Sequence, residues 1–217
     1  RRYECLCRHR SVFLMSIISA ADTGAADLPE IANSLRFDGT NDHLARTLTA
    51  GDQQKFTWSG WVKRSALSYD WATLMASGSE FLWFDATDKL QWWQAAVGAR
   101  VQTSGPFRDV TGHLHVVIAV DTTQANAIDR FKIWINGTAQ TVTNPVATAQ
   151  NTSLPFNNAG SHYLGCYSAG YYWFSGYLSN VCFIGGQALA ASNFGYTDPN
   201  GQWRSLSKAA LTTLASA

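Results

Sequence analysis

Few residues in this 217-residue chain could carry out acid–base chemistry. Hydrolysis of a glycosidic bond, for example, needs two carboxyl groups, one as the acid and the other as base or nucleophile. The sequence holds only three glutamates, Glu4, Glu30 and Glu80, and two of them precede the first clear strand pattern. Asp85 and Asp88 flank a short turn-like segment, and we interpret them as turn formers. The sequence therefore predicts a protein that is not an enzyme.

Histidines provide the next candidate chemistry. His113 and His115 lie two residues apart in a predicted strand, so they share one face of it. Two imidazoles on one face can begin a zinc site, but the nearby sequence offers no obvious third ligand. We therefore favour structural or partly exposed histidines at these positions. The sequence also lacks a P-loop, a nucleophile elbow and a dinucleotide-binding fingerprint.

Asp38, Asn41 and Asp42 form an oxygen-rich turn. Carboxylate and amide oxygens are the ligands that calcium prefers, so these three residues are the candidate metal ligands. Their spacing fits no EF-hand loop, and an Asx-stabilised turn without a metal is the alternative that we favour. The sequence suggests no cofactor other than this calcium ion.

Aromatic residues are frequent, with nine tryptophans and eight tyrosines. We expect many of them in the core, but rings on polar strand faces or near turns can stack on sugars or fill a protein interface. Trp92 and Trp93 are adjacent, so at least one of them points away from the core if one sheet face is solvated. The candidate ligand-binding residues are Tyr69, Trp71, Trp92, Trp93, Trp134, Tyr171 and Tyr172.

These side chains must be positioned mainly by β-strands. The chain is 46% apolar but only 14% charged, and this composition favours strands and turns over helices. Phe56, Trp58 and Val62 share one face of a predicted strand with period-two alternation. Asn136 and Gly137 predict a tight type I′ turn between two further strands. About ten or more short strands of this kind imply two packed sheets.

The organisation along the chain predicts one domain with two short ends. Residues 1–25 form an N-terminal extension, which resembles either a secretory signal or sequence upstream of a true start at Met15. Residues 26–205 form the domain, with no internal repeat or linker. Residues 206–217 form a C-terminal tail, which is either frayed or an attachment helix.

Five segments, taken in order, resemble the strands of laminin-G-like domains of the concanavalin A type. They are SLRFDGTNDHLART (34–47), FTWSGWVKR (56–64), GHLHVVIAVD (112–121), RFKIWINGT (130–138) and FSGYLSNVCFIGGQAL (174–189). The resemblance implies an all-β fold, a two-sheet antiparallel jelly-roll sandwich. Gly112 stands where such strands usually have Trp, and Ser179-Asn180 stands where they have Asp-Glu, which weakens any acidic site carried over from relatives.

Within this family, the VDTTQA and FIGGQAL segments look most like laminin-G-like proteins encoded by bacteriophages. This resemblance implies a non-enzymatic structural or adhesion module of a phage-like virion, which contacts other virion proteins or a host-surface glycan. The net charge of +1 argues against nucleic-acid binding, and we expect no membrane span. The alternative is a secreted, extracellular carbohydrate-binding lectin assisted by calcium. Either interpretation is compatible with a homo-oligomer.

Overall fold

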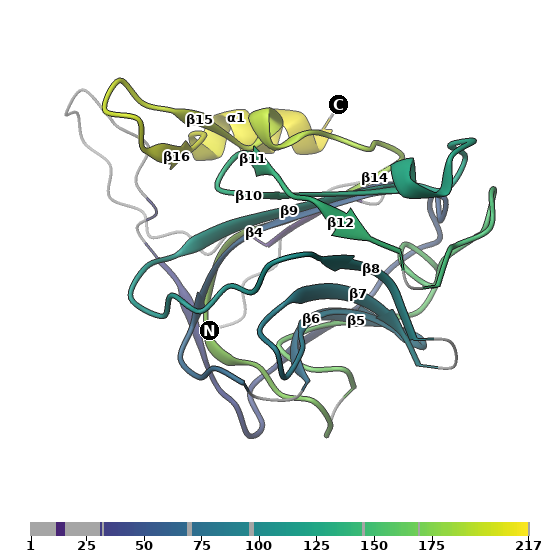
Figure 1. Cartoon of the computed structure of the whole chain (residues 1–217), viewed down its shortest axis with the longest axis horizontal. Coiled ribbons are helices and arrows are strands. Elements are labelled where there is room, and N and C mark those ends of the chain that lie inside the picture. The colour runs from purple at the N-terminus through teal and green to yellow at the C-terminus, as the bar shows by residue number, and fades with distance from the viewer. Residues whose placement is uncertain are drawn as a thin grey trace.

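A computed structural model describes the chain at residues 12–15, 31, 33–68, 71–95, 98–144, 146–168 and 170–216. These residues form two seven-stranded antiparallel sheets, a two-stranded hairpin and one α-helix. The two large sheets face each other across a shared core, so the predicted all-β jelly-roll sandwich is confirmed. Figure 1 shows the two sheets as stacked layers, with the C-terminal elements on the far side of one of them.

The first large sheet, called sheet A, contains the longest strands of the domain. Its order is β1-β14-β4-β9-β10-β11, and β1 and β2 pair with different halves of one edge of β14. β1 falls within the expected N-terminal extension. The strands of sheet A are β1 (Val12–Met15), β2 (Leu35–Asp38), β4 (Lys55–Arg64), β9 (Leu114–Asp121), β10 (Phe131–Ile135), β11 (Thr138–Ala139) and β14 (Ser175–Gly185).

The second large sheet, called sheet B, is built mostly from consecutive strands joined by tight turns. Its order is β12-β8-β7-β6-β5-β13-β3. Sheet A, by contrast, has a short 3-10 helix, η1 (Ala127–Asp129), in the connection between its strands β9 and β10. The strands of sheet B are β3 (Leu44–Thr47), β5 (Ala72–Ser77), β6 (Glu80–Phe84), β7 (Leu90–Gln94), β8 (Gly98–Thr103), β12 (Val142–Thr143) and β13 (Ser161–Leu164).

The core fills the space between the sheets because the inward side of each central strand is apolar. Phe56, Trp58 and Val62 share this side of β4, as predicted, and all three are buried. From sheet B, Leu82 and Trp92 point into the same core. The rings of Phe56 and Trp92 lie 5.7 Å apart and join the two layers. Burying a large apolar side chain in this way contributes roughly 1.5–3 kcal/mol.

The strands β10 and β11 are joined directly through Asn136 and Gly137, whose φ angles are +48° and +77°. Both angles lie in the left-handed region that a type I′ turn requires, so the predicted hairpin is confirmed. A Cβ atom at residue 137 would clash with the ring of Trp203. Glycine is therefore needed here for the close approach of the C-terminal segment as well as for the turn.

The C-terminal segment forms a layer over the outer face of sheet A (Figure 1). It comprises η2 (Ala191–Asn193), β15 (Gly195–Thr197), β16 (Trp203–Ser205) and α1 (Lys208–Ser216). Phe194 and Leu211 pack against Cys182 and Ile184 of β14 in a second buried cluster. Residues 206–217, expected as a tail, therefore contain a helix that packs on the sandwich. In the described part of the chain, no helix has the length and hydrophobicity of a membrane span.

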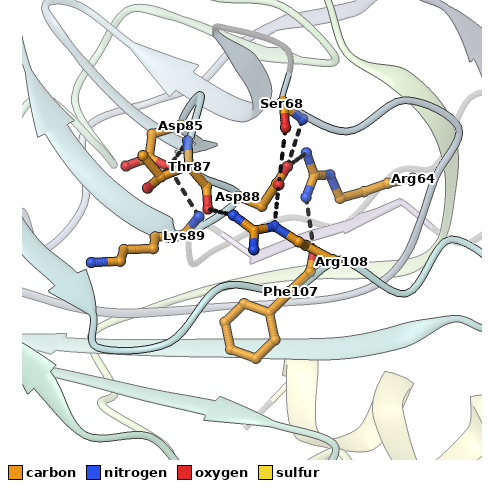
Figure 2. Close-up of polar contacts among 8 residues, drawn as sticks. All are labelled: Arg64, Ser68, Asp85, Thr87, Asp88, Lys89, Phe107 and Arg108. Carbon is orange, nitrogen blue, oxygen red and sulfur yellow. Dashed lines mark hydrogen bonds and ion pairs between the residues drawn. The ribbon is translucent and has the colours of Figure 1, made fainter.

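A buried ion pair joins the two sheets at one end of the sandwich, as Figure 2 shows. Arg64, the last residue of β4, donates from Nη2 to Asp88 Oδ1 at 2.8 Å, and both side chains are almost fully buried. Asp88 lies in the β6–β7 turn and also accepts bonds from the Ser68 backbone and from Arg108 Nε. Arg64 Nη1 donates to the Phe107 carbonyl. The network thus fixes three loops to the end of β4.

Asp88 stays ionised because its hydrogen bonds outweigh its burial. Burial alone would raise the pKa of this carboxyl group, but bonds from Ser68, Arg108 and Arg64 lower the pKa of Asp88 to about 2. The ordinary value in an unfolded chain is about 3.9. The network therefore stabilises the fold above that pH and loses this contribution as the pH falls toward 2.

Replacing Asp88 by Asn should destabilise the fold, because Arg64 would keep its charge in a buried site without a counterion. We expect Asp88→Asn to lower the free energy of unfolding by about 3–5 kcal/mol, as measured by urea denaturation at neutral pH. The matched control is Arg108→Gln, which removes the 60% exposed partner of the same carboxylate. This variant should lose about 1 kcal/mol or less. Equal losses in the two variants would contradict the role of the buried pair.

Candidate functional site

The outer face of sheet B, on the side away from the core, carries two rows of side chains that cross the strands. Residues that pair in register on one face have Cβ atoms about 4.5–5.5 Å apart, so the side chains of each row are neighbours. The first row, from β8 to β3, is Ala99, Trp93, Phe81, Ala76, Tyr163 and Ala45. The second row, from β8 to β5, is Gln102, Gln91, Trp83 and Thr73.

Trp71, the residue immediately before β5, is the centre of an aromatic cluster on this surface. Its ring stacks on Trp83 with centroids 4.5 Å apart and on Tyr172 with centroids 4.3 Å apart. Trp93 meets Trp71 edge-on at 6.2 Å. We name this cluster the outer aromatic face. Its members are Trp71, Phe81, Trp83, Trp93, Tyr167, Tyr171 and Tyr172.

Two local irregularities bring these rings together. The pairing of β7 with β8 shifts register between Trp92 and Trp93, and such a bulge re-aims the side chains beside it. The loop between β13 and β14 then returns over the sheet, held by an isolated bridge between Ser168 and Tyr171. This loop supplies the tyrosines of the outer aromatic face, whereas β6 and β7 supply the rings beneath them.

Two rings of the outer aromatic face belong to residues with a strained backbone conformation. Trp71 has a φ angle of +73° and Tyr172 of +58°, in the left-handed region that bulky residues rarely adopt. Each such residue costs of the order of 1–3 kcal/mol and persists only where the surrounding structure fixes it. The stacking of these two rings on each other supplies part of that fixation. Strain of this kind is typical of functional sites.

Two polar atoms beneath the rings have no hydrogen-bond partner. Trp83 Nε1 and Gln91 Oε1 are buried and unpaired, although the two residues face each other across β6 and β7. The nitrogen atom of the Gln91 amide does have a hydrogen-bond partner, because Nε2 donates to Asp85 Oδ2. An unpaired buried polar group costs about 1–3 kcal/mol.

The outer faces of the two sheets differ in how they are covered. On sheet A, the C-terminal layer buries the apolar outer side chains. On sheet B, the described residues form no comparable layer, and the cover consists of Trp71 and the β13–β14 loop. Trp71, Trp93 and Tyr172 stay partly exposed, and Tyr171 is 64% exposed. The outer aromatic face is therefore the candidate binding surface of the domain.

Two carboxylates of sheet B and its turns are engaged in structural bonds. Glu80, the last glutamate of the sequence, accepts from Arg100 Nε and from Trp92 Nε1, both at 2.7 Å, inside the sandwich. Burial raises the pKa of Glu80, and the bonds from Trp92 and Arg100 oppose this shift. Asp88 is held by the ion-pair network at the end of β4. Neither carboxylate is free to act as an acid or a base.

A serine–histidine pair lies under the C-terminal layer, but the proton of its histidine is on the nitrogen that faces the serine, so the histidine cannot act as a base toward it. His115 Nε2 and Ser59 Oγ are 2.9 Å apart, and Trp203 Nε1 lies 2.9 Å from His115 Nδ1. An indole N–H can only donate, so Nδ1 must accept and the proton of the neutral imidazole is on Nε2. His115 therefore donates to Ser59 and cannot take its proton. His113 precedes β9 and is exposed.

The oxygen-rich segment after β2 is an Asx turn. Asp38 Oδ2 accepts from Thr40 Oγ1, and Asp38 Oδ1 accepts from the backbone N–H groups of Thr40 and Asn41. These bonds, that of Thr40 Oγ1 foremost, lower the pKa of Asp38 to about 2. Within the described ranges, no three His, Cys, Asp or Glu side chains gather as metal ligands. Calcium binding by Asp38, Asn41 and Asp42 stays a prediction.

The jelly-roll topology agrees with the family that the sequence itself matches. A laminin G-like family model, described as the concanavalin A-like lectin/glucanases superfamily, matches residues 38–192, well over half of the chain. The chain belongs to this superfamily. All seven residues of the outer aromatic face fall inside the matched range, so the candidate surface is part of the concanavalin A-like domain.

Solved structures with this fold are only distantly similar in sequence. A heptameric SAP-like pentraxin from Limulus polyphemus aligns with a TM-score of 0.51 and 14% identity, over 72% of this chain and 77% of the pentraxin. A Trypanosoma rangeli sialidase in complex with sialic acid aligns with a TM-score of 0.52 and 16% identity. That alignment covers 74% of this chain and 26% of the sialidase. No curated protein matches the chain. At these identities, the likeness establishes the fold alone.

The concanavalin A-like domain brings together four of the seven residues predicted to bind a ligand. Trp71, Trp93, Tyr171 and Tyr172 all belong to the outer aromatic face, although they come from two regions far apart in the sequence. Tyr69 lies outside the described residues. The clustering groups these rings into one surface, and their role in binding stays a prediction.

One of the two remaining predicted binding residues requires correction. Trp92 is 1% exposed and lies in the core between the sheets, because it takes the inward side of β7 and leaves the outward side to Trp93. Trp134 lies on the outer side of sheet A, away from the outer aromatic face, and packs partly exposed against the cluster under the C-terminal layer. Ligand binding by Trp134 stays a prediction.

Three members of the outer aromatic face were not among the predicted residues. Phe81 and Trp83 alternate with Leu82 and Phe84 along β6, which makes this strand apolar on both sides. That pattern could have predicted the outward rings Phe81 and Trp83, because only one side of a strand can face the core of a two-sheet sandwich. Tyr167 has no such signal, since its position depends on the path of the β13–β14 loop.

The buried His115 predicts how stability depends on pH. Burial lowers the pKa of His115 to about 3, below the ordinary value of about 6.5 in an unfolded chain. Between these values the unfolded chain binds the proton, so stability should be highest above about pH 6.5 and fall toward pH 3. Protonated Nδ1 would also oppose the N–H group of Trp203.

The variant His115→Gln tests this dependence. It should show a smaller loss of stability than the parent chain when urea denaturation is repeated at about pH 7.5 and about pH 4.5. The buried His162 is present in both proteins and cancels in the comparison. Identical pH dependence in the two proteins would contradict the contribution of His115.

Proposed function

We propose that this domain is a non-enzymatic module that binds carbohydrate through the outer aromatic face of sheet B. The observation that carries the proposal is the stack of Trp71 on both Trp83 and Tyr172, beside the exposed Tyr171. Flat aromatic rings offer a large apolar contact area to the C–H faces of a sugar ring. The packing that maintains the strained backbone at Trp71 and Tyr172 also keeps these rings in place before a ligand arrives.

Polar groups that a ligand can reach accompany the rings of this surface. Ligand sites are mostly apolar with a few placed polar groups. Here the amide of Gln102, in the second outward row, belongs to a partly exposed residue, and the hydroxyl of Tyr171 to an exposed one. Sugar hydroxyls both donate and accept hydrogen bonds, so they can bond both groups.

The absence of catalysis is part of the proposal. Hydrolysis of a glycosidic bond needs an acid and a base or nucleophile on either side of the bond. Glu80 is bound by Arg100 and Trp92 inside the sandwich, and Asp88 is bound by two arginines. His115 donates its proton to Ser59. These three groups are therefore engaged in structural bonds, which supports a role without catalysis.

We further propose that the domain acts on the surface of a phage-like virion. The support is the likeness of its VDTTQA and FIGGQAL segments to laminin-G-like proteins encoded by bacteriophages. In that setting, the outer aromatic face would bind a host-surface glycan, and the rest of the surface would contact other virion proteins. A rigid sandwich suits this role, because loops and one sheet face can vary on a stable core.

A secreted lectin assisted by calcium is the second candidate. The exposed carboxylates of Asp38 and Asp42, close together in the turn after β2, favour it. Asp38 stays ionised far into acid, as a calcium ligand must. In this case, glycan binding should be abolished by EDTA, whereas binding by the outer aromatic face alone should be unaffected by it.

The variant Tyr171→Ala tests the proposed surface without disturbing the fold, because Tyr171 is 64% exposed. A glycan array on the parent chain identifies a ligand, and calorimetry then measures affinities. Tyr171→Ala should weaken binding about tenfold, which corresponds to about 1.4 kcal/mol. The matched control is Ile128→Ala, which removes the 50% exposed Ile128 from η1 and should change nothing. Failure to bind any glycan, or equal affinities in both variants, would contradict the proposal.

The place on a virion has a separate test. Purified particles from the source should contain this chain when their proteins are identified by mass spectrometry. Its absence from the particles would overturn the virion proposal and leave the carbohydrate-binding proposal standing.

A further inference from the structure

Part of the outer face of sheet A carries cations beside aromatic rings. Tyr177 of β14 pairs in register with Arg36 of β2 on one side and with Lys63 of β4 on the other. Trp61 lies two residues before Lys63 on β4. Each of the four residues adjoins a core residue along its strand, so alternation places all four on the outer face. Arg36 is exposed and the other three are partly exposed. We name these four residues the basic aromatic patch.

The C-terminal layer ends beside the basic aromatic patch and does not bury it. Trp203 of that layer lies over His115, with ring centroids 6.0 Å apart, and His115 in turn stacks on Trp61 at 4.9 Å. The buried cluster that the described residues form under the layer contains none of the four patch residues. The patch is therefore the accessible continuation of the outer face of sheet A.

The two cations of the patch have no counterion of their own. In the described part of the chain, neither Arg36 nor Lys63 forms an ion pair. Asp38, on the same face of β2, accepts hydrogen bonds within its own turn instead. Asp109 is held in the same way, since its bonds from Thr111, and to a smaller extent the charge of Lys63, lower the pKa of Asp109. The guanidinium and ammonium groups are therefore available to an anionic ligand.

The patch can recognise a ligand only through its side chains. At Tyr177 and Lys63, β14 and β4 are flanked by strands on both sides, so their backbone groups are paired within the sheet. An extended peptide that binds through its main chain finds no free strand edge at these two strands. A sugar ring needs no such edge, because it can stack on an aromatic ring while carboxylate or sulfate groups of the same chain bind the cations.

We infer that the basic aromatic patch binds an acidic polysaccharide, with a sugar ring on Tyr177 and anionic groups on Arg36 and Lys63. The strand pairing places the Cα atoms of the two cations two strand spacings apart, about 10 Å, on either side of the ring. Long side chains at both positions can then reach anionic groups on one ligand chain. The patch lies on the other sheet from the outer aromatic face, and the inference does not rest on the proposed function.

Polysaccharides that share a backbone but differ in charge test the inference. Oligogalacturonate and its methyl ester, and dextran sulfate and dextran, are titrated by calorimetry against the full chain at low and at physiological salt. The charged member of at least one pair should bind about tenfold or more tightly than its neutral counterpart, and added salt should weaken this binding. The two pairs distinguish a carboxylate ligand from a sulfate ligand. Equal binding of charged and neutral members, or tighter binding of poly-glutamate as an acidic peptide, would overturn the inference.

Charge variants locate the site. Arg36→Gln and Lys63→Gln should each lower affinity for the acidic ligand about threefold or more, and the double variant about tenfold or more. The matched control is Lys132→Gln, which removes the same charge from the outer face of sheet A at a position already paired with Asp129. This control should change affinity about twofold at most. Equal losses in Lys63→Gln and Lys132→Gln would overturn the inference.

Ring variants test the stacking. Tyr177→Ala should lower affinity for the acidic ligand about tenfold, whereas Tyr177→Phe retains the ring and should bind nearly as the parent chain does. If Tyr177→Ala fails to fold by circular dichroism, Arg36→Gln and Lys63→Gln decide the result. Unchanged affinity in a folded Tyr177→Ala would overturn the inference. If neither acidic polysaccharide binds, the inference falls, while the outer aromatic face keeps its separate test with Tyr171→Ala.

Discussion

Both sheets of this sandwich carry large apolar side chains on both of their faces, and this constraint shapes the rest of the molecule. The inner faces bury each other, but each outer face needs a cover of its own. On sheet A, the cover is the C-terminal layer, with Phe194 and Leu211 packed over β14. On sheet B, short loops and Trp71 bury the outward rings of β6 but leave Trp93 of β7 and the covering rings themselves partly exposed. The asymmetry leaves the outer aromatic face available to a ligand.

The surface rests on a rigid base. Trp92 fills the core directly beneath sheet B, and its Nε1 atom is fixed by Glu80, which Arg100 also holds. At the end of the same sheet, the β6–β7 turn is tied to sheet A by the pair of Arg64 and Asp88 (Figure 2). Separating either of these buried pairs would leave a charge without a counterion inside the protein, which is strongly unfavourable. The pairs therefore keep β6 and β7 in one position. A site built on such strands is preorganised, which lowers the entropic cost of binding.

The sequence was sufficient for the architecture because strand patterns are local. Alternation along β4 and the turn at Asn136 could be predicted before any tertiary contact was known. The candidate site was harder to predict from the sequence. Alternation at Trp92 and Trp93 indicates that one of the two rings faces outward, but it does not indicate which one. Trp134 lies on the outer side of sheet A, and its contact with the C-terminal layer could not be predicted from the pattern of β10 alone. The assembly around Trp71 depends on positive φ angles and a returning loop, which no local pattern encodes.

The proposed function depends on carbohydrate binding at the outer side of sheet B. Nuclear magnetic resonance of the tryptophan indole N–H groups, recorded during titration with a glycan that binds, reports on this surface directly. The signals of Trp71, Trp83 and Trp93 should shift, whereas those of the core residues Trp58 and Trp92 should not. Shifts confined to other tryptophans, with these three unchanged, would contradict it.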